Sequence, residues 1–419
     1  MSQIAITDIG LCTPLGDDPQ QVLARLVAGD ISAMTQRDDL LFGQSTLVGQ
    51  VSQTLADIPT ALSEFDCRNN QLLLVAAKQI ATKVEHAKAQ FNAERIGIVI
   101  GTSTSGIAKG EAALAYHQAH GHFPDDYHYF QQELGSTCDF LRRYFGLKGP
   151  CYTVSTACSS SAKVFASAKR LLQAKLCDMV IVGGVDSLCQ LTVNGFHSLE
   201  SVSSGHCNPF SLHRDGINIG EGAALFTLER CEHLSENHSE AVILAGIGES
   251  GDAHHISAPH PQGHGAIAAM EAALKDANLQ AAQISYVNLH GTATPKNDAM
   301  ESLAVNAVFA PTLPQCSSTK PLTGHALGAA GAIEAAFCYL LLSPLNRTQQ
   351  LPPHIWDNQQ DPQNPPLALV KQGKGTSTPI QHIMSNSFAF GGSNASLIFS
   401  RAAATPRQIH PEHESSENA

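Results

Sequence analysis

The chain has 419 residues, of which 43% are hydrophobic and 15% are charged. A chain of this length is longer than one hydrophobic core usually accommodates, which predicts two domain-sized units or one duplicated unit. The high hydrophobic content excludes global disorder. Twenty-five basic residues against 37 acidic residues leave a net charge of −12, which disfavours general nucleic-acid binding and attraction to an anionic membrane.

The sequence carries no pattern of export or membrane insertion. Residues 1–8 lack a basic stretch followed by an apolar core, so no signal peptide is expected. No segment reaches the roughly 18 consecutive apolar residues of a membrane span. The 11 cysteines are odd in number and follow no regular frame, which is typical of reduced thiols in a cytoplasmic protein.

Short apolar runs rich in β-branched residues alternate along the chain with alanine-rich segments of helical character. This alternation favours an α/β fold whose strands are buried on both faces. Glycines at positions 101 and 183–184 are expected to end the two strands that precede them. The expected elements are a buried helix over residues 72–83, a strand at 96–100, a strand at 179–182 and a core helix over 326–342.

Two segments are expected to be irregular. Residues 343–366 are rich in Pro, Gln and Asn, which predicts a long surface loop. Residues 402–419 are polar and show no periodicity, which predicts a disordered tail.

Three short patterns recur in the same order in the two halves of the chain. They pair residues 4–10 with 242–248, residues 101–104 with 291–294, and residues 155–158 with 317–320. A duplicated βαβ-type unit explains these repeats, with one half over residues 1–240 and the other over 241–401. Chance similarity between short segments is the alternative.

Cys158 lies between an extended run and a small-residue helix, in Val154-Ser-Thr-Ala-Cys-Ser-Ser-Ser-Ala162. This position predicts a sulfur at a helix N-terminus, where the dipole and the free N–H groups stabilise a thiolate. No acidic residue occurs between Asp139 and Asp178 to oppose that effect. Cys158 is therefore a candidate nucleophile, and an inert buried cysteine is the alternative.

Two histidines occupy similar junctions between a strand and a helix. His290 follows a strand and precedes Gly-Thr-Ala-Thr, in which the hydroxyls of Thr292 and Thr294 could line a channel. His325 lies where a helix is expected to start, which favours its neutral form. Most of the 20 histidines are expected to be structural or exposed, but one cysteine and two histidines at such junctions form a candidate catalytic group.

Lys320 is flanked by apolar and small residues, so its ammonium group should need a partner. Glu301 is the predicted partner, and a solvated lysine is the alternative. Residues 385–394 form a glycine-containing turn between two strand-like runs. Within it Phe390 is either a gate on a mobile loop or a core residue at a β-bulge.

A histidine-rich segment over residues 252–264 suggests a metal site. Its two prolines, its flexible spacing and its lack of cysteine disfavour a preformed tetrahedral site, so a loop that lines a pocket is the preferred interpretation. The histidines concerned are His254, His255, His260 and His264.

Together these segments resemble the β-ketoacyl-acyl-carrier-protein synthases, the elongating condensing enzymes of type II fatty-acid and polyketide systems. The resemblance covers residues 4–401 and rests on the segments around Cys158 and His290, residues 207–222, the Lys320/His325 segment and the Phe388-Ala-Phe-Gly-Gly turn. It implies an α/β fold of the duplicated thiolase type, with five layers (αβαβα) in each protomer of a dimer.

The resemblance also implies a role for individual residues. By position, the nucleophile is Cys158, the catalytic histidines are His290 and His325, the supporting residues are Lys320, Glu301 and Asp298, the pantetheine contacts are Thr292 and Thr294, and the gate residues are Phe388 and Phe390. The N–H groups of Phe390 and Cys158 would form the oxyanion hole. No cofactor is implied for the chemistry, but a structural monovalent cation is implied beside Asn288, Leu289, Glu334, Ser385 and Asn386.

The implied reaction is a decarboxylative Claisen condensation between an acyl group on Cys158 and malonyl-carrier protein. A thiolase would need a second cysteine on the C-terminal glycine turn, and no cysteine follows Cys338. A cysteine protease would leave His325 and Lys320 without a use. A non-catalytic chain-length partner of a heterodimeric ketosynthase is the alternative from another class, and such partners lack the nucleophilic cysteine.

Three departures from the family pattern concern the substrate and its chain length rather than the reaction type. Ala389 replaces a usual Gly, Lys296-Asn297 replaces the middle of a usual Pro-x-Gly-Asp, and residues 101–106 differ from the housekeeping form. These features are similar to the ketosynthases of aryl-polyene and related specialised clusters.

The implied partners are an acyl carrier protein, whose phosphopantetheine arm holds the acyl or malonyl group, and a second ketosynthase-like chain, identical or not. Carrier proteins are acidic, as this chain is, so docking is expected to depend on local basic contacts. The candidate contacts are Arg68, Arg142, Arg143, Lys148 and Arg214.

Overall fold

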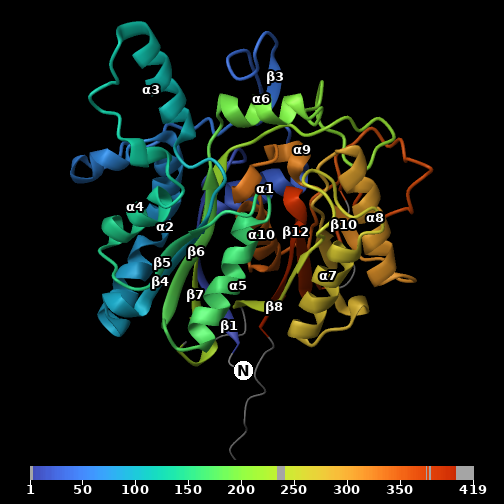
Figure 1. Ribbon diagram of the computed structural model, residues 1–419. Helices are drawn as coiled ribbons and strands as arrows, with labels where there is room; N and C mark the ends of the chain where they lie inside the picture. The colour runs from blue at the N-terminus through green and yellow to red at the C-terminus, as the bar shows by residue number, and fades with distance from the viewer. Residues whose placement is uncertain (1–2, 234–240, 374, 377–378, 403–419) are drawn as a thin grey trace, which may run out of the picture.

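The computed structural model describes residues 3–233, 241–373, 375–376 and 379–402 (Figure 1). The predicted tail at 402–419 therefore lies, apart from its first residue, outside the described residues. Ten strands form one mixed sheet, and a separate hairpin pairs β2 (Met34–Arg37) with β3 (Thr46–Gly49). The sheet strands are β1 (Ile4–Cys12), β4 (Ile96–Gly101), β5 (Cys151–Val154), β6 (Met179–Asp186), β7 (Gly222–Arg230), β8 (Val242–Gly251), β9 (Tyr286–Asn288), β10 (Gln315–Ser317), β11 (His382–Phe388) and β12 (Ser393–Arg401).

The sheet consists of two half-sheets that share one topology. From the centre outwards, the first half has the order β1-β7-β6-β4-β5 and the second has β8-β12-β11-β9-β10. In each half the first two pairings are antiparallel and the last two are parallel. The halves meet where β1 pairs with β8. Each pair of repeats lies on equivalent strands or directly after them, so the predicted duplication is confirmed.

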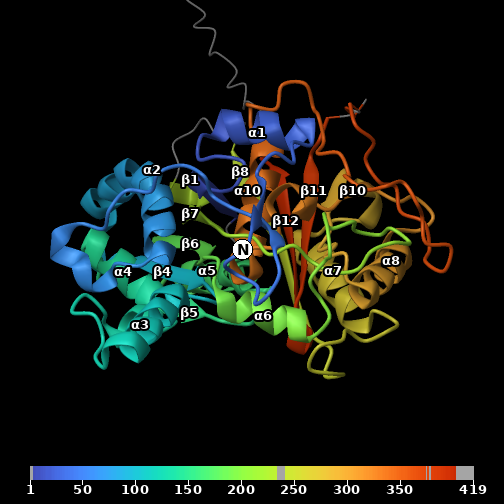
Figure 2. The same cartoon turned by 90° about the horizontal axis from the view of Figure 1, so that it is seen from above.

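The helices form three layers around the two half-sheets. Helices α5 (Ser160–Gln173) and α10 (Ala330–Leu342) lie between the half-sheets and contact both of them. Helices α2 (Arg68–Phe91) and α4 (Ser136–Phe145) cover the outer face of the first half, while α7 (His264–Ala277) and α8 (Pro295–Phe309) lie on the outer side of the second (Figures 1 and 2). The predicted five-layered thiolase-type architecture is therefore confirmed. The remaining helices are α1 (Pro19–Ala28), α3 (Ile107–His120), α6 (Gln190–Ser198) and α9 (Lys320–Thr323).

The position of α10 follows from its composition. Every residue of α10 except Tyr339 is buried, because the helix packs against strands on two sides. A helix that is apolar all round is stable only in such a central layer. The prediction placed the start of this helix at residue 326, but residues 327–329 form a 3₁₀ turn and the α-helix begins at Ala330.

Two other predicted elements differ from the structure. The glycines at 183–184 do not end their strand, since β6 continues to Asp186 in register with β7. A Cβ atom at Gly184 would lie 2.4 Å from Ser161 Cβ, so this glycine permits close packing of α5 on the strand. Residues 343–366 are irregular as predicted, but the segment 351–354 is buried rather than exposed.

The predicted helix at 72–83 forms the middle of the longer α2, and the predicted strand at 96–100 is β4 with Gly101 as its last residue. Among the described residues, no helix combines the length and the apolar character that a membrane crossing requires.

Candidate active site

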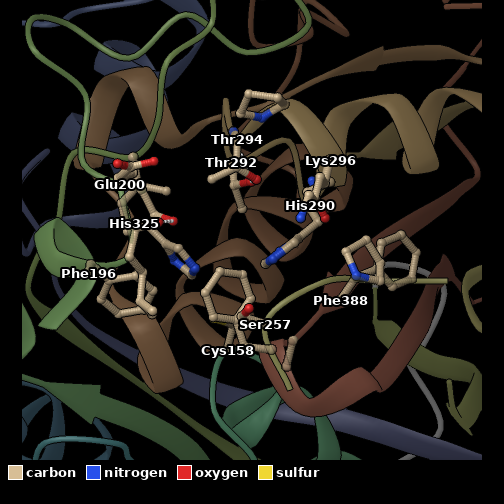
Figure 3. A pocket seen from close by; sticks show the side chains of 18 residues that line it. Cys158, Phe196, Glu200, Ser257, His290, Thr292, Thr294, Lys296, His325 and Phe388 are labelled. Atoms are coloured by element: carbon tan, nitrogen blue, oxygen red, sulfur yellow. Dashed lines mark hydrogen bonds between the residues drawn. The ribbon is translucent and has the colours of Figure 1, made fainter. Parts of the chain in front are cut away.

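Three side chains contributed by the two halves meet near the ends of the parallel strands. Cys158 follows β5, His290 follows β9, and His325 follows β10 and the short α9. The sulfur of Cys158 and one ring nitrogen of each histidine lie within 4.8 Å of one another (Figure 3). The two imidazole rings meet edge to face, with centroids 5.4 Å apart. The structure therefore brings the predicted group together.

The backbone before Cys158 turns sharply to present the sulfur. Ala157 has φ 51°, in the left-handed region that alanine rarely adopts. The side chain of Ser160 donates a hydrogen bond to the Ala157 carbonyl, which fixes the turn. Helix α5 begins at Ser160, so the sulfur lies just before the helix N-terminus, as expected. The backbone N–H of Phe390 also points at the Cys158 sulfur.

The expected thiolate is not the resting form of Cys158. Burial raises the pKa of the thiol to about 11, and the charge of Lys320 and the N–H groups of Phe390 and Cys158 offset only part of that effect. Desolvation penalises the ionised form of a group that is completely enclosed. The prediction from the helix N-terminus was therefore wrong for the free protein, because it ignored the depth at which the sulfur lies.

This result predicts how Cys158 reacts with iodoacetamide. Because only the thiolate is alkylated and the pKa is about 11, the rate at Cys158 should rise about tenfold per pH unit between pH 7 and pH 10. Mass spectrometry of the tryptic peptide 149–163 measures this rate, with Cys151 in the same peptide separated by fragmentation. A plateau below pH 8 would show a stabilised thiolate instead.

Both histidines are neutral and available to a ligand. Burial and the nearby Lys320 hold the pKa of each imidazole well below its usual value. Neither ring nitrogen of His325 has a hydrogen-bond partner among the described residues, nor has Nδ1 of His290. Buried nitrogens without partners are costly unless a ligand satisfies them. The pair can therefore donate two hydrogen bonds to one oxygen placed between them.

Backbone hydrogen bonds to a neighbouring segment fix the position of His325, which does not lie at the start of a helix. Its N–H donates to the Asn218 carbonyl and its carbonyl accepts from the Gly220 N–H. The residue lies between α9 and the 3₁₀ turn at 327–329, so the expected helix N-terminus directly at His325 was wrong.

Lys320 is buried and pairs with Glu334, not with Glu301. Lys320 Nζ lies 2.5 Å from Glu334 Oε1 on the central helix α10. Glu301 instead accepts the backbone N–H groups of His290 at 2.8 Å and Gly291 at 2.7 Å. The predicted Lys320–Glu301 pair was therefore wrong, because both carboxyl oxygens of Glu301 accept hydrogen bonds from the backbone at His290 and Gly291. Glu301 thereby fixes the position of His290.

Asp298 has a similar role in the first turn of α8. It accepts the backbone N–H of Phe210 at 2.7 Å, and burial raises its pKa to about 6. Burial raises the pKa of Glu301 to about 7. Both carboxyl groups are therefore fully buried, and each holds a backbone segment near the site.

The residues predicted to hold a cation occupy three neighbouring elements. Asn288 ends β9 and is in register with Ser385 of β11, while Glu334 lies on α10. Asn288 Oδ1 and Glu334 Oε2 are buried and have no hydrogen-bond partner among the described residues. Oxygen atoms of this kind suit a hard cation, so the donor set fits the group. Asn386 is more fully engaged, since its Oδ1 accepts from Ser396.

The three central side chains open into a pocket of about 260 Å³. Thr292 and Thr294 line it, and their hydroxyls are 2.9 Å apart. Phe388 and Phe390 line it as well, and the Phe390 ring lies 5.6 Å from that of Phe196. Figure 3 shows Cys158 at the bottom of the pocket, Thr292 and Thr294 at the opposite end, and Phe388 to one side. The residues predicted for a channel and a gate are therefore brought to one cavity.

The sequence did not indicate several residues of the pocket wall, which come from α6 and the segment after it and carry no motif. These residues are Phe196, Leu199, Glu200 and Ser201. Two further wall residues lie in segments that carry the family resemblance or depart from it, namely Ile217 within residues 207–222 and Lys296 in the first turn of α8.

The histidine-rich loop lines the same pocket through Ser257 and Pro259. Its Ile256 carbonyl accepts the N–H of Gly391, which joins the loop to the turn that carries Phe390. The rings of His260 and His264 stack 4.2 Å apart. Among the described residues, the loop histidines do not converge as a metal-ligating group, so the pocket-lining interpretation is the one the structure supports.

The five basic residues predicted to contact a carrier are engaged within this chain. None of them lines the pocket, and each pairs with an acidic side chain. The pairs are Arg68 with Glu221, Arg142 with Asp139, Arg143 with Glu64 and Asp139, Lys148 with Glu94, and Arg214 with Asp361. The exposed Lys296 lines the pocket instead, and no described acidic side chain forms an ion pair with it.

Comparisons with known proteins agree on one family. The family described as beta-ketoacyl synthase, N-terminal domain, matches residues 1–233, and its C-terminal domain matches residues 241–355. The chain is 30% identical to the mitochondrial 3-oxoacyl-[acyl-carrier-protein] synthase of Arabidopsis thaliana, over 95% of this chain and 93% of that protein. It is 29% identical to 3-oxoacyl-[acyl-carrier-protein] synthase 2 of Staphylococcus aureus strain COL, over 96% and 99%.

Solved structures resemble the chain over nearly its whole length. One is a chain of the complex between a ketosynthase and its chain length factor from Xenorhabdus doucetiae, with a TM-score of 0.88, 44% identity, and coverage of 96% of this chain and 98% of that chain. Another is a beta-ketoacyl synthase from Burkholderia phymatum STM815, with a TM-score of 0.81, 28% identity, and coverage of 96% and 100%.

Proposed function

The chain belongs to the β-ketoacyl synthase family, and from that membership we propose that it is a 3-oxoacyl-[acyl-carrier-protein] synthase. Such an enzyme is an acyltransferase that joins an acyl group to a malonyl unit with loss of CO₂. The observation that carries the assignment of residues is the convergence of Cys158, His290 and His325 within 4.8 Å at the end of the pocket.

In the first step Cys158 accepts the acyl group. Its thiol loses a proton as the sulfur attacks the thioester carbonyl of an acyl-carrier protein, and the carrier thiol leaves. The carbonyl oxygen becomes an oxyanion, which the N–H groups of Cys158 and Phe390 stabilise. One such donor contributes on the order of 3 kcal/mol to the transition state. Because the neutral histidines lie beside the sulfur, either can receive the thiol proton.

In the second step malonyl-carrier protein enters the emptied pocket. His290 and His325 donate hydrogen bonds to its thioester oxygen as the C–C bond to the carboxylate breaks and CO₂ leaves. The resulting enolate carbon attacks the acyl carbonyl on Cys158, the C–S bond breaks, and β-ketoacyl-carrier protein departs. Two neutral donors suit this step because no α-proton has to be removed.

The direct test is incubation of the protein with a panel of acyl-carrier proteins and malonyl-carrier protein, followed by mass analysis of the carrier-bound products. The expected product is the acyl group extended by two carbons as a β-ketone, with one CO₂ released per turnover. Absence of any extended product across the panel would overturn the assignment. The panel also reveals the chain length, for which the family departures at residues 101–106 and Ala389 favour a specialised, aryl-polyene-like substrate over a housekeeping one.

A chain-length partner within a heterodimer is the second candidate function. Two similar solved structures are of a ketosynthase with a chain length factor, at 44% and 24% identity, which motivates this alternative. Such partners need no nucleophile, whereas this chain places Cys158 against two histidines. The arrangement favours the catalytic role, and we infer a dimer with an identical or ketosynthase-like chain.

The remaining inferences concern the surroundings of the enzyme. All 11 cysteines are free, which supports a reducing, cytoplasmic location. The unpartnered oxygens of Asn288 and Glu334 support a structural monovalent cation held with the Leu289 carbonyl, Ser385 and Asn386. Such a cation would neutralise charge behind Lys320 and hold β9 and β11 in place, without taking part in bond making.

Lys296 is proposed as a contact for the phosphate of the carrier arm, because it is an exposed cation on the pocket wall next to Thr292 and Thr294. Lys296→Ala should raise the KM for carrier-bound substrates about fivefold, the loss of one charge-assisted contact. Turnover of a pantetheine thioester that lacks the phosphate should not change. Lys275→Ala, on the exposed face of α7, is the matched control. An equal rise in KM for both substrates would show that Lys296 does not contact the phosphate.

A further inference from the structure

Asp186 is a buried carboxylate near the candidate active site that the proposed mechanism does not use. It is the last residue of β6 and is 0% exposed. Its Oδ2 accepts the N–H of Ala329, in the 3₁₀ turn of the second half, at 3.1 Å. Its Oδ1 accepts four hydrogen bonds from the turn after β4, namely the N–H groups of Ser103 at 2.8 Å and Thr104 at 2.7 Å and the hydroxyls of Thr102 at 2.7 Å and Thr104 at 2.8 Å. One carboxylate therefore joins a turn of the first half to a turn of the second half.

All five groups that hydrogen-bond to Asp186 are donors. Thr102 Oγ1 accepts the N–H of Ser105 at 3.0 Å, and Thr104 Oγ1 accepts the N–H of Ser187 at 3.1 Å. The hydroxyl hydrogens of both threonines are therefore directed at the Asp186 carboxylate. Burial raises the pKa of Asp186, and these hydrogen bonds oppose that effect. A buried group that accepts five hydrogen bonds is costly to replace, because each donor would lose its partner.

The first of the two turns contacts the segment that presents Cys158. Ser103 Oγ donates to the carbonyl of Ala157 at 3.4 Å. Ala157, with its φ of 51°, directly precedes Cys158. A Cβ atom at Gly101 would lie 2.4 Å from the backbone nitrogen of Ser161, so the end of β4 packs closely on the start of α5. Backbone in a sparsely populated conformation persists only where its surroundings hold it, and the turn after β4 is part of those surroundings.

The second turn, residues 327–329, leads back to His325. One residue separates the two, and the first residue of the turn has φ 47°, again in the left-handed region. The two turns are also in direct contact, because a Cβ atom at Gly328 would lie 2.6 Å from Ser103 Oγ and 2.8 Å from Asp186 Oδ2. The position of His325 relative to the first half therefore depends on how Asp186 holds this turn.

We propose that Asp186 is a positioning residue that holds Cys158 and His325 at their working distance by hydrogen-bonding to both turns. It does not line the pocket, so it acts through the backbone of the turns and not by touching the substrate. This role rests on the proposed function, since it concerns the two chemical steps at Cys158 and His325.

Asp186→Asn tests the link to the second half. Four donors face the position of Oδ1, so the asparagine oxygen should occupy it and the amide NH₂ should meet the N–H of Ala329. Two donors that face each other leave both hydrogen bonds unmade, so the turn should move and displace His325. A crystal structure of the variant should place the nearer ring nitrogen of His325 beyond the 4.8 Å that bounds its distance from the Cys158 sulfur in the unaltered chain. An unmoved His325 would overturn the proposal.

The kinetic effect of Asp186→Asn should fall on the step that needs His325. Starting from the acyl-enzyme, kcat for malonyl decarboxylation should fall about 10- to 100-fold, the usual cost of misplacing a catalytic group by about 1 Å, while KM changes by less than about twofold. Self-acylation of Cys158 should fall by less than about threefold, because the first turn keeps its acceptor. Equal losses in the two steps would contradict the proposed role. If the unaltered protein makes no extended product, the proposed function fails, whereas the position of His325 in the variant still decides the role of Asp186.

Ser103→Ala tests the link to the first half and serves if Asp186→Asn does not fold. It removes the hydroxyl that reaches Ala157 but keeps the backbone N–H that donates to Asp186. Self-acylation should fall roughly threefold, the effect of one weak hydrogen bond, and decarboxylation by the acyl-enzyme should not change. Self-acylation at the unaltered rate would overturn the proposal.

Glu229→Gln is the matched control for Asp186→Asn. Glu229 is also a buried carboxylate, but it accepts from Thr7 and pairs with Lys83, and it does not line the pocket. Both rates and the distance between Cys158 and His325 should stay unaltered in this variant, even if Tm falls. A loss of decarboxylation as large as that in Asp186→Asn would assign the effect to reduced stability and contradict the positioning role.

Discussion

Cys158→Ala should abolish acyl transfer while the protein remains folded. The variant retains the pocket, both histidines and the backbone N–H groups, but it has no atom that can hold the acyl group. We expect condensation to fall by at least about 10³-fold, as for other enzymes that lose a nucleophile. The mass of the intact protein after incubation with an acyl-carrier protein should show no acyl adduct, which reports the first step alone.

A matched control separates chemistry from folding. Cys177 is as fully buried as Cys158 but packs in the main core, away from the pocket. Both alanine variants lose one buried sulfur, which costs about 1 kcal/mol and lowers Tm by only a few degrees in a chain of this size. Cys177→Ala should therefore keep normal turnover. An acyl adduct on Cys158→Ala, or a condensation rate within tenfold of normal, would end the assignment of the nucleophile.

Two equivalent halves explain how a single site arises from distant segments. The first half places Cys158 after β5, and the second places Lys320 after the equivalent strand β10. Glycine–threonine turns follow the equivalent strands β4 and β9, but their side chains have diverged. Thr102 and Thr104 bind the buried Asp186, whereas the threonines after β9 face the pocket. The two halves therefore provide equivalent positions at the strand ends, and the different side chains at those positions determine the chemistry of the site.

The sequence could predict those residues that lie at strand ends, because the ends of parallel strands meet at one edge whatever the details of packing. It could not predict that Lys320 pairs with Glu334 rather than Glu301, since both acids lie on helices that the sequence places only roughly in space. The raised pKa of Cys158 could not be predicted for a related reason. A helix N-terminus is a local feature, whereas the burial of the Cys158 sulfur depends on how the two halves pack together, since His290, His325 and Phe390 of the second half line the same pocket.

Pocket walls were the least predictable part. Phe196 and Glu200 belong to α6 and the turn after it, which pack across the site from outside the half-sheets. Neither carries a motif, and their contact with the pocket follows from the path of a long connection between β6 and β7. Connections of this length have few local constraints on where they pack.

The histidine variants should distinguish the two chemical steps. His290→Ala and His325→Ala each remove one neutral donor from the position where the enolate oxygen forms. We expect each to slow malonyl decarboxylation by about 10²–10³-fold, the usual effect of losing one oxyanion donor. Self-acylation of Cys158 should fall by less than about tenfold, because the N–H groups of Phe390 and Cys158 that stabilise its oxyanion remain in place.

Two measurements on the same samples decide between roles for these histidines. Release of CO₂ from malonyl-carrier protein reports decarboxylation, and the mass of the acyl-enzyme reports self-acylation. His264→Ala, an exposed ring on the loop of residues 252–264, is the control and should change neither rate. If self-acylation fell as far as decarboxylation, the histidines would act chiefly as bases for the protonated thiol, whose pKa of about 11 makes such help valuable. If only self-acylation fell, the enolate would be stabilised by other groups, and Lys320, whose charge reaches both imidazoles, would be the next residue to substitute.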